Sequence, residues 1–464
     1  MAFIIPSAFA GPWGIVVNTL TMNIHTIDLG QTPPKVYGPF LTGALGNSYE
    51  FLQDVAITPD NNYALISNLL GRKVYRIDIS DPTNPVLAGT LDFGLFAPED
   101  IAISPNGQFA VISDGGLTDS QLVFINLSSF PSYNLYTLTS SNLRAHAVAI
   151  GNDNSTVIMA DFGNSRIIFG KVNPMFTGLI SEDNLYAEAT PVNISISPDG
   201  STVLAAGWNS IVSVFQIAGP GTVVPGATPK IIGFHERPQS IAFAPDGKKA
   251  YVFSSNSGGL QNTLSWLQVN GPGNVAMGGE RAAFLSSYYS GGWFGVDALA
   301  VSPAGNLAIA TCPTTSPDSR NRVSLINLNN YQVTAIDATQ PDACSAAVFN
   351  EAVFAPTNAG LSRMTNNYIF YKEYINRLTW EANAKNKFPI AKYRIYRKAA
   401  GAADSTYMQV GEVAASSLQY DDRGLKKNDA YAYKITSLND RGIESAGVEV
   451  SNVIAIGRVI GRVR

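Results

Sequence analysis

Five polar side chains stand at or near the start of apolar segments that recur along the chain, and their types suit acid–base chemistry. They are Glu99, Arg144, His146, Arg237 and Asp297. A carboxylate or an imidazole can move a proton and a guanidinium can hold an anion, so this set could open a lactone by hydrolysis. Their spacing matches no nucleophile elbow, zinc-protease helix, phosphate loop or calcium loop. The residues therefore favour binding first, with catalysis as the alternative.

The elements that would position these side chains come from a repeated phrase. An apolar tripeptide is followed by Ser/Thr/Ala-Pro-Asp/Asn-Gly, or a worn version of it, and then by a second apolar run. The phrase recurs every 46 to 48 residues, with one longer step of 58, and its copies begin at Val55, Ile101, Val148, Ile194, Ile241, Leu299 and Ala347. Pro presets φ and Asp/Asn-Gly accepts a positive φ, so each phrase predicts a tight hairpin. The second apolar run is the second strand of the hairpin, as at 109–113, and a third strand follows, as at 73–79, 121–126, 166–171 and 323–327.

Seven such units predict a ring. Four short antiparallel strands in roughly 40–50 residues is the size of one β-propeller blade. The last phrase, 347–354, has a hairpin but no third strand, whereas 14–29 has strands without a phrase. We expect the N-terminal strands to complete the last blade, which would close a seven-bladed propeller over residues 1–354 and remove its free edges. The repeats resemble the YVTN-type, lactonase-like β-propellers, and this resemblance implies a fold rather than a function.

The period stops near Ala355, and residues 355–464 resemble a fibronectin type III domain. Trp380 stands where that family has the core Trp of its second strand. The tyrosine-corner signature of the family, Leu-x5-Tyr-x-Tyr-x-Val, is matched by Leu425, Tyr431, Tyr433 and Ile435. The predicted fold class is therefore all-β, a seven-bladed β-propeller followed by a fibronectin type III-like β-sandwich with a short C-terminal tail.

Residues just before each first strand would surround the mouth of the propeller channel. Among them, we expect Asp54 and Asp100 to accept backbone N–H bonds from the neighbouring loop and so close the blade, which is a structural role. His146 lies at the same mouth, whereas His25 lies on an alternating strand and is predicted at the surface. The mouth is thus the predicted place for a ligand or for chemistry.

The longer step of 58 residues inserts a Gly-flanked aromatic loop. It contains Tyr288, Tyr289, Trp293 and Phe294, and the loop with Trp208 and Asn209 is predicted on the same face. Exposed aromatic side chains on loops grip sugars or proteins, so these six residues are candidate binding residues. The alternative is that the four rings of the insert fold back as a plug over the channel or pack on the C-terminal domain.

Composition narrows the classes of partner. A net charge of −4 leaves no basic footprint for nucleic acid, and no apolar run is long enough for a transmembrane helix. Three His and two Cys without a Cys-x-x-Cys predict neither a metal site nor a cofactor. Cys312 and Cys344 fall on the same face of adjacent blades, where they form either a disulfide or two buried thiols.

The ends and the low charge bear on location. Residues 1–10 end in Ala-Phe-Ala and are either the remnant of a secretory signal or a structural arm. A charged fraction of 14% suits an exported protein or one covered by partners. The sequence thus predicts a non-catalytic binding or scaffold protein that is secreted, periplasmic or on a cell surface. It would bind protein or glycan, as an adhesin does, or serve as a subunit of a homo- or hetero-oligomeric assembly such as a virion or appendage. The alternative is a lactonase-like hydrolase.

Overall fold

The chain is built almost wholly of β-strands in the computed structural model. The structure describes residues 12–19, 21–47, 49–115, 121–139, 145–232, 237–255, 262–284, 299–311, 323–336, 343–349, 353–386, 389–440, 442–455 and 458–463. Within these ranges the helices are two single 3-10 turns, Leu127–Ser129 and Asp404–Thr406, and none is long and apolar enough to cross a lipid bilayer. Residues 10–350 form one compact unit, and residues 351–464 belong to a second.

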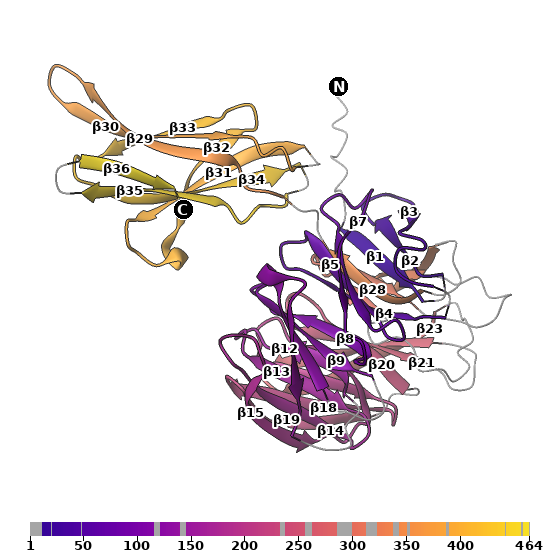
Figure 1. Cartoon of the computed structure of the whole chain (residues 1–464). Helices are drawn as coiled ribbons and strands as arrows, with labels where there is room; N and C mark the ends of the chain where they lie inside the picture. The colour runs from indigo at the N-terminus through magenta and orange to yellow at the C-terminus, as the bar shows by residue number, and fades with distance from the viewer. Residues whose placement is uncertain are drawn as a thin grey trace. The chain divides into compact units, whose positions relative to one another are not determined.

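The first unit consists of four-stranded antiparallel sheets, seven of them in the described ranges (Figure 1). One sheet consists of β4(Leu52–Ile57), β5(Tyr63–Asn68), β6(Lys73–Asp78) and β7(Val86–Asp92). The next consists of β8(Pro98–Ile103), β9(Phe109–Asp114), β10(Gln121–Asn126) and β11(Tyr133–Thr137). A third consists of β12(Ala145–Ile150), β13(Thr156–Asp161), β14(Arg166–Val172) and β15(Leu179–Tyr186). A fourth consists of β16(Pro191–Ile196), β17(Thr202–Gly207), β18(Ile211–Gly219) and β19(Thr222–Ile232). A fifth consists of β20(Arg237–Phe243), β21(Lys249–Ser255), β22(Asn262–Gly271) and β23(Asn274–Phe284). A sixth consists of β24(Leu299–Val301), β25(Leu307–Ala310), β26(Val323–Asn327) and β27(Gln332–Ile336).

The repeated phrase makes the hairpin at the start of these sheets. In the second copy, the Ser104 N–H donates to the Phe109 carbonyl (2.8 Å) and the Gly107 N–H donates to the Ser104 carbonyl (2.7 Å). Gly107 has φ +70°, a conformation that glycine adopts without strain. The strand that follows begins at Phe109, and β10 spans Gln121–Asn126, as the sequence predicts.

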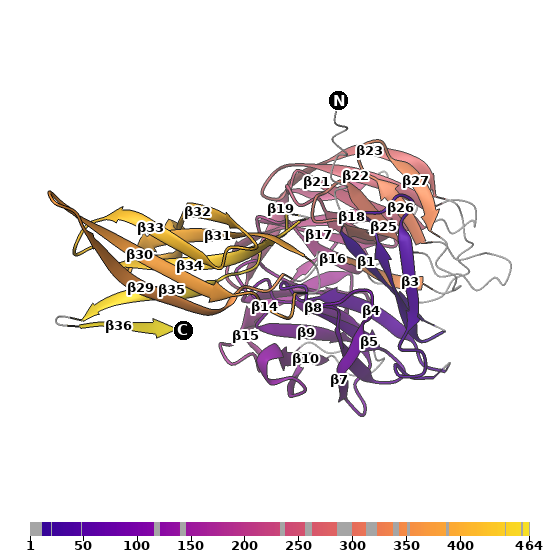
Figure 2. The same cartoon turned by 90° about the horizontal axis from the view of Figure 1, so that it is seen from above.

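The first strand of each sheet contacts the first strands of two other sheets, and the series returns to its start. The order of contacts is β28(Ala343–Phe349), β4, β8, β12, β16, β20, β24 and again β28. Apolar side chains fill the space between adjacent sheets, as where Phe109 and Phe124 pack with Met159. In Figure 2 the indigo strands at the start of the chain lie beside the orange strands at the end of this unit. The fold is propeller-like, and its core lies between the faces of neighbouring sheets.

The seventh sheet joins the two ends of this unit. Its order is β28, β1(Trp13–Asn18), β2(Asn23–Asp28), β3(Lys35–Phe40), with Trp13 opposite Phe349 and Val17 opposite Ser345. The N-terminal strand β1 thus pairs with β28, which contains the start of the last phrase. The predicted division of strands is wrong, because the N-terminus supplies three strands and 343–349 supplies one. All six residues of β1 are buried, as suits a strand with a neighbour on each side.

The same sheet corrects the prediction for His25. This residue lies on β2 and is only 1% exposed, because sheets cover both faces of that strand. Its Nδ1 lies 2.9 Å from Nδ2 of Asn18, and burial lowers the pKa of the imidazole. His25 is therefore part of the core rather than of a surface.

The second unit contains two antiparallel sheets. One is β29(Thr357–Asn367), β30(Lys372–Glu381) and β33(Gln419–Leu425), and the other is β32(Met408–Ala414), β31(Ile390–Ala399), β34(Tyr431–Asn439), β35(Val448–Ala455) and β36(Arg458–Val463). Trp380 on β30 meets Tyr393 on β31 edge to face, with ring centroids 5.3 Å apart. Both rings are buried in one cluster with Tyr433, so this unit has a hydrophobic core of its own.

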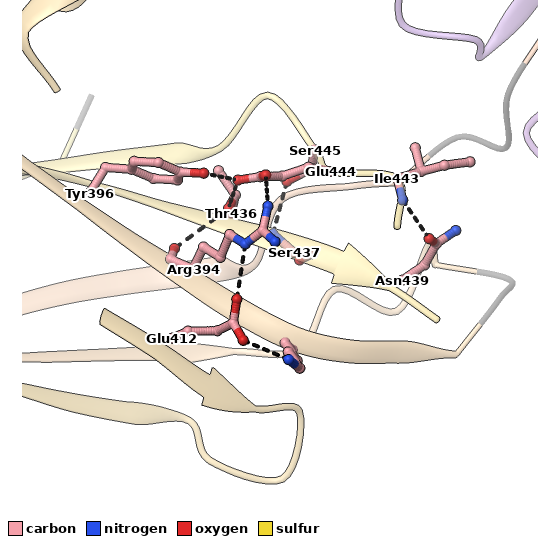
Figure 3. A network of polar contacts seen from close by, with 10 residues as sticks. Arg394, Tyr396, Glu412, Thr436, Ser437, Asn439, Ile443, Glu444 and Ser445 are labelled. Atoms are coloured by element: carbon pink, nitrogen blue, oxygen red, sulfur yellow. Dashed lines mark hydrogen bonds and ion pairs between the residues drawn. The ribbon is translucent and has the colours of Figure 1, made fainter. Parts of the chain in front are cut away.

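A polar network holds one face of the larger sheet (Figure 3). Arg394 on β31 donates to Glu412 on β32 (3.0 Å) and to Glu444 (2.7 Å), and Glu444 also accepts hydrogen bonds from Tyr396 and Thr436 (2.6 Å each). Burial raises the pKa of Glu444, but these three donors outweigh it, so that its pKa lies below the ordinary value. The network fixes the segment after β34 against the sheet.

Candidate functional site

Polar side chains at the start of the inner strands link neighbouring sheets to one another. Each accepts the N–H of the first phrase residue of the next sheet. The bonds run from Ile101 to Asp54 (3.1 Å), Val148 to Asp100 (2.7 Å), Ile241 to Asn193 (3.0 Å) and Leu299 to Ser240 (3.2 Å). Asp54 and Asp100 accept backbone N–H bonds as predicted, but the predicted donor is wrong, because the N–H groups belong to the neighbouring inner strand and not to a loop. We call these four acceptors the inter-sheet belt.

Asp54 is the most deeply buried charged group of the belt. It is 0% exposed, and Ser345 on β28 donates to its Oδ1 (3.0 Å). Burial raises its pKa, although hydrogen bonds with the Asp100 side chain and with the N–H groups of Val55 and Ile101 act in the opposite direction. Burial outweighs these bonds, so the pKa of Asp54 lies above its ordinary value.

Glu99 and His146, from adjacent sheets, form a carboxylate–imidazole pair. Nδ1 of His146 lies 2.8 Å from Oε1 of Glu99, and their side chains are 11% and 8% exposed. Glu99 precedes the belt residue Asp100 on β8, and His146 lies at the start of β12. The two strands that carry the pair are therefore joined by the hydrogen bond from Val148 to Asp100. A carboxyl group at Nδ1 orients the ring, as a proton-transfer site requires.

Aromatic rings continue from this pair toward a guanidinium. His146 meets Phe162 edge to face (centroids 5.5 Å apart), and Phe162 meets Trp208 in the same way (5.0 Å). The Arg237 guanidinium lies over the Trp208 ring at 5.5 Å from its centroid. Phe162 and Trp208 are partly exposed and Arg237 is exposed. We call Glu99, His146, Phe162, Trp208 and Arg237 the rim arc.

The strand register places the rim arc at one end of the inner strands. Phe162 directly follows Asp161, the last residue of β13, which pairs with Ala145 at the start of β12. Trp208 likewise follows Gly207, which pairs with Pro191 at the start of β16. Arg237 is the first residue of β20. Four sheets therefore bring an acid, an imidazole, two aromatic faces and a cation to the same rim.

Asn209, the neighbour of Trp208, supports this rim. Its side chain donates to the Glu188 carbonyl and accepts the Thr190 N–H (3.3 Å). The Trp208 N–H also donates to the Thr190 carbonyl (3.3 Å). Asn209 thus ties the turn after β17 to the connection before β16 and holds the backbone that carries Trp208.

Several candidates from the sequence lie outside the described residues. They are Arg144, Tyr288, Tyr289, Trp293, Phe294, Asp297 and Cys312. Cys344 lies on β28, but its side chain is not described, so the proposed disulfide with Cys312 also lies outside. Of the five candidate catalytic residues, the structure describes Glu99, His146 and Arg237. Within the same ranges no group of three or more His, Cys, Asp and Glu could hold a metal ion.

Sequence reasoning missed Phe162 because no motif surrounds it. A positional signal was present, since Phe162 and Trp208 both directly follow the second strand of a sheet. Aligning the residue after each second strand would have placed Phe162 beside Trp208.

A cavity lies between the inner strands. It has a volume of about 430 Å³ and is bounded by β4, β16, β20, β24 and β28. Most of its lining side chains are apolar, with Ile57 and Phe243 among them, and Ser195 contributes a hydroxyl. A second cavity, of about 440 Å³, has Asp246 and Lys249 in its lining. The rim arc differs from both cavities because it joins an acid, an imidazole, aromatic rings and a cation.

Comparison with known proteins supports the fold and leaves the function open. No protein-family profile and no curated protein matches the chain. Among solved structures, a functionally unknown protein from Desulfotomaculum acetoxidans is similar at TM-score 0.59 and 16% identity, covering 73% of this chain and 99% of its own. A candidate 6-phosphogluconolactonase from Bacteroides fragilis is similar at TM-score 0.57 and 13% identity, covering 74% of this chain and 100% of its own. The periplasmic gluconolactonase of Pseudomonas aeruginosa is similar at TM-score 0.55 and 14% identity, covering 73% of this chain and 99% of its own. At such identities the likeness shows the fold alone. The chain has an all-β, propeller-like fold built of four-stranded sheets, similar to that of 6-phosphogluconolactonase-like proteins.

Proposed function

We propose that the first unit is a closed seven-bladed propeller of the YVTN type, and that the second is a fibronectin type III-like sandwich. The closed series of contacts between inner strands and the pairing of β1 with β28 support the propeller. Two packed sheets, a buried Trp380 on the second strand of the unit and a buried Tyr433 support the sandwich. Each finer assignment rests on these observations together with the sequence pattern.

We further propose that the protein is a binding protein that acts outside the cytoplasm and holds an acidic sugar at the rim arc. The observation that carries this proposal is the contiguous row from His146 through Phe162 and Trp208 to Arg237. A partly exposed indole face accepts the C–H face of a sugar ring, and the guanidinium pairs with a carboxylate. The Glu99–His146 pair at the other end offers an acceptor and a donor for hydroxyl groups.

Replacing Trp208 by alanine tests this site. With a panel of neutral sugars and the matching sugar acids measured by calorimetry, we expect the wild-type chain to bind sugar acids. We expect Trp208→Ala to weaken that binding about tenfold, because the stacking face is lost, and Arg237→Ala to abolish the preference for the acid. Tyr63→Ala is a matched control, since Tyr63 stacks on Arg76 at the opposite end of the strands. Binding that Trp208→Ala leaves unchanged would contradict the proposal.

A second candidate function, lactone hydrolysis, is favoured by the 2.8 Å contact between Glu99 and His146. Oriented by Glu99, the imidazole would take a proton from water as the water oxygen bonds to the lactone carbonyl carbon. The ring C–O bond then breaks, and the imidazolium returns its proton to the leaving alkoxide, which gives a hydroxy acid. Because the similar structure from Pseudomonas aeruginosa is that of a gluconolactonase, a sugar lactone is the first substrate to test.

The two functions are separated by turnover. If the protein is a hydrolase, a lactone panel followed by acid release should show a rate above spontaneous hydrolysis, and His146→Ala should lower that rate about 10²–10⁴-fold. Glu99→Gln should lower kcat more than it raises KM, because it disturbs the orientation of the base. A rate no higher than the uncatalysed one, with sugar-acid binding intact, would leave binding as the function.

A further inference from the structure

The hairpin of β29 and β30 ends in four large side chains that are open to solvent. The exposed fractions are 48% for Tyr368, 92% for Ile369, 95% for Phe370 and 62% for Tyr371. Residues of this kind ordinarily lie inside a protein, and a contiguous exposed group of them marks a contact surface. In Figures 1 and 2 the loop between β29 and β30 projects beyond the neighbouring strands of the second unit. We call these four residues the hairpin tip.

The hairpin tip is a defined turn. The Tyr368 N–H donates to the Tyr371 carbonyl (2.9 Å), and the two tyrosine rings stack with centroids 4.6 Å apart and an angle of 17° between their planes. This closed turn presents Ile369 and Phe370 at its apex with the tyrosines on its flanks. A preorganised apex pays little ordering entropy when it meets a partner.

Positive charge lies behind the tip. Lys372, Lys426 and Lys427 are exposed, and among the described residues no carboxylate lies within ion-pair distance of them. Tyr374 on β30 pairs with Leu425 on β33, which brings Lys426 and Lys427 to the same end of the sheet as Lys372. The exposed Arg423 shares this end, where it pairs with Glu373 (3.3 Å). Asp429 accepts the Lys426 N–H (2.8 Å), so Glu373 and Asp429 offset part of the charge of the three lysines and Arg423, and the balance beside the apolar apex stays positive.

We propose that the hairpin tip inserts into the surface of an anionic lipid bilayer. The Ile369 and Phe370 side chains would enter the boundary of the acyl chains, and the tyrosine rings would lie at the depth of the headgroups, where amphipathic aromatic rings are favoured. The lysines would meet the negative surface behind them. An apolar apex, flanking tyrosines and exposed lysines together match a bilayer interface, whereas a protein groove would need only the apex. This inference does not depend on the function proposed for the rim arc.

Sedimentation of the full chain with lipid vesicles tests the proposal. We expect wild-type protein to bind phosphatidylcholine vesicles that contain phosphatidylserine, and to bind pure phosphatidylcholine vesicles more weakly. The double variant Ile369→Ser, Phe370→Ser should bind at least about tenfold more weakly, because it loses the buried apolar area. Lys426→Glu, Lys427→Glu should lose about fivefold for each lysine, and the loss should vanish at high salt.

Met408→Ser is the matched control, because Met408 is 72% exposed in the same unit but lies on β32. It should bind vesicles as the wild type does, and circular dichroism should show all variants folded. Wild-type protein that stays in the supernatant with both kinds of vesicle would overturn the proposal. So would equal vesicle binding by the Ile369, Phe370 double variant. A concentration-dependent dimer, lost in the double variant and formed without vesicle binding, would assign the tip to a second copy of the chain instead.

Discussion

Replacing Asp54 by alanine is expected to lower the free energy of unfolding of the propeller-like unit by about 3–5 kcal/mol. The carboxyl group is fully buried between β4, β8 and β28, where it accepts the Ile101 N–H and the Ser345 hydroxyl. Alanine removes the Asp54 acceptor from both buried donors, so that the Ile101 N–H keeps only Oδ1 of Asp100 (3.0 Å), and it opens a cavity at the contact between sheets. Hydrogen exchange of the amides in β4 and β8, together with denaturant unfolding, measures the change.

Two variants sharpen this prediction. Asn retains an acceptor for the Ile101 N–H, so Asp54→Asn should be destabilised less than Asp54→Ala. Ser240→Ala removes a neutral member of the belt, whose single bond to the Leu299 N–H should contribute about 1 kcal/mol. A loss for Asp54→Ala no larger than that for Ser240→Ala would show that the buried carboxyl has no special part in joining the sheets.

Because the pKa of Asp54 is raised, the difference in unfolding free energy between the wild type and Asp54→Asn should depend on pH. A carboxyl whose pKa is higher in the folded than in the unfolded state makes the folded chain bind more protons between the two values. Stability from this group therefore rises as the pH falls from above the folded pKa toward the unfolded value of about 3.9, and rises no further below it. Asp54→Asn should lack this dependence, so the stability difference between wild type and Asp54→Asn should shift in favour of the wild type on acidification.

The second large effect is expected in the C-terminal unit, where Asp422→Ala should lower its free energy of unfolding by about 3–5 kcal/mol. Asp422 accepts a hydrogen bond from the buried Tyr433 hydroxyl (2.6 Å), and both of its oxygens accept from Nη1 of Arg397 (3.1 and 2.8 Å). Removing the carboxylate leaves a guanidinium and a phenol partly or wholly buried without their acceptor. Exchange rates of the β34 amides in the full chain report this loss.

Asp421, the next residue, supplies the control. It pairs with Arg377 (2.7 Å) and with Arg423 (3.2 Å), whose side chains are 33% and 53% exposed. Ion pairs near solvent contribute little, so Asp421→Ala should have a much smaller effect than Asp422→Ala. Equal losses at the two positions would mean that the Tyr433–Asp422–Arg397 contacts do not carry the stability of this unit.

Much of the strand pattern follows from the sequence because the repeat aligns one copy with another. The phrase predicts β9 from Phe109, and the third strands at 73–79 and 121–126, to within a residue. The predicted exposure of a side chain is wrong where other sheets cover both faces of its strand, because the alternation of polar and apolar residues does not show such packing. His25 sits in a period-2 pattern typical of a half-exposed strand, but packing on both sides buries it.

The candidate site was predictable only in part for a related reason. Glu99, His146 and Arg237 could be found because they stand at or near the start of a repeated phrase. Their approach to one another depends on aromatic contacts between sheets, through Phe162 and Trp208, which no local spacing encodes. The sequence pattern predicts the strand register within one copy of the repeat, whereas the contacts between residues of different copies depend on how the sheets pack.

The union of β28 with β1 has a consequence for biosynthesis. During translation, the segment 13–40 leaves the ribosome first, yet the strand that flanks Trp13–Asn18 is made only when residues 343–349 emerge. For nearly the whole of that interval, a nascent chain carries an uncapped strand with an apolar face, which is prone to associate with neighbouring polypeptides. Completion of this unit therefore waits for residues 343–349, and we expect its first strands to be open to association until those residues have been made.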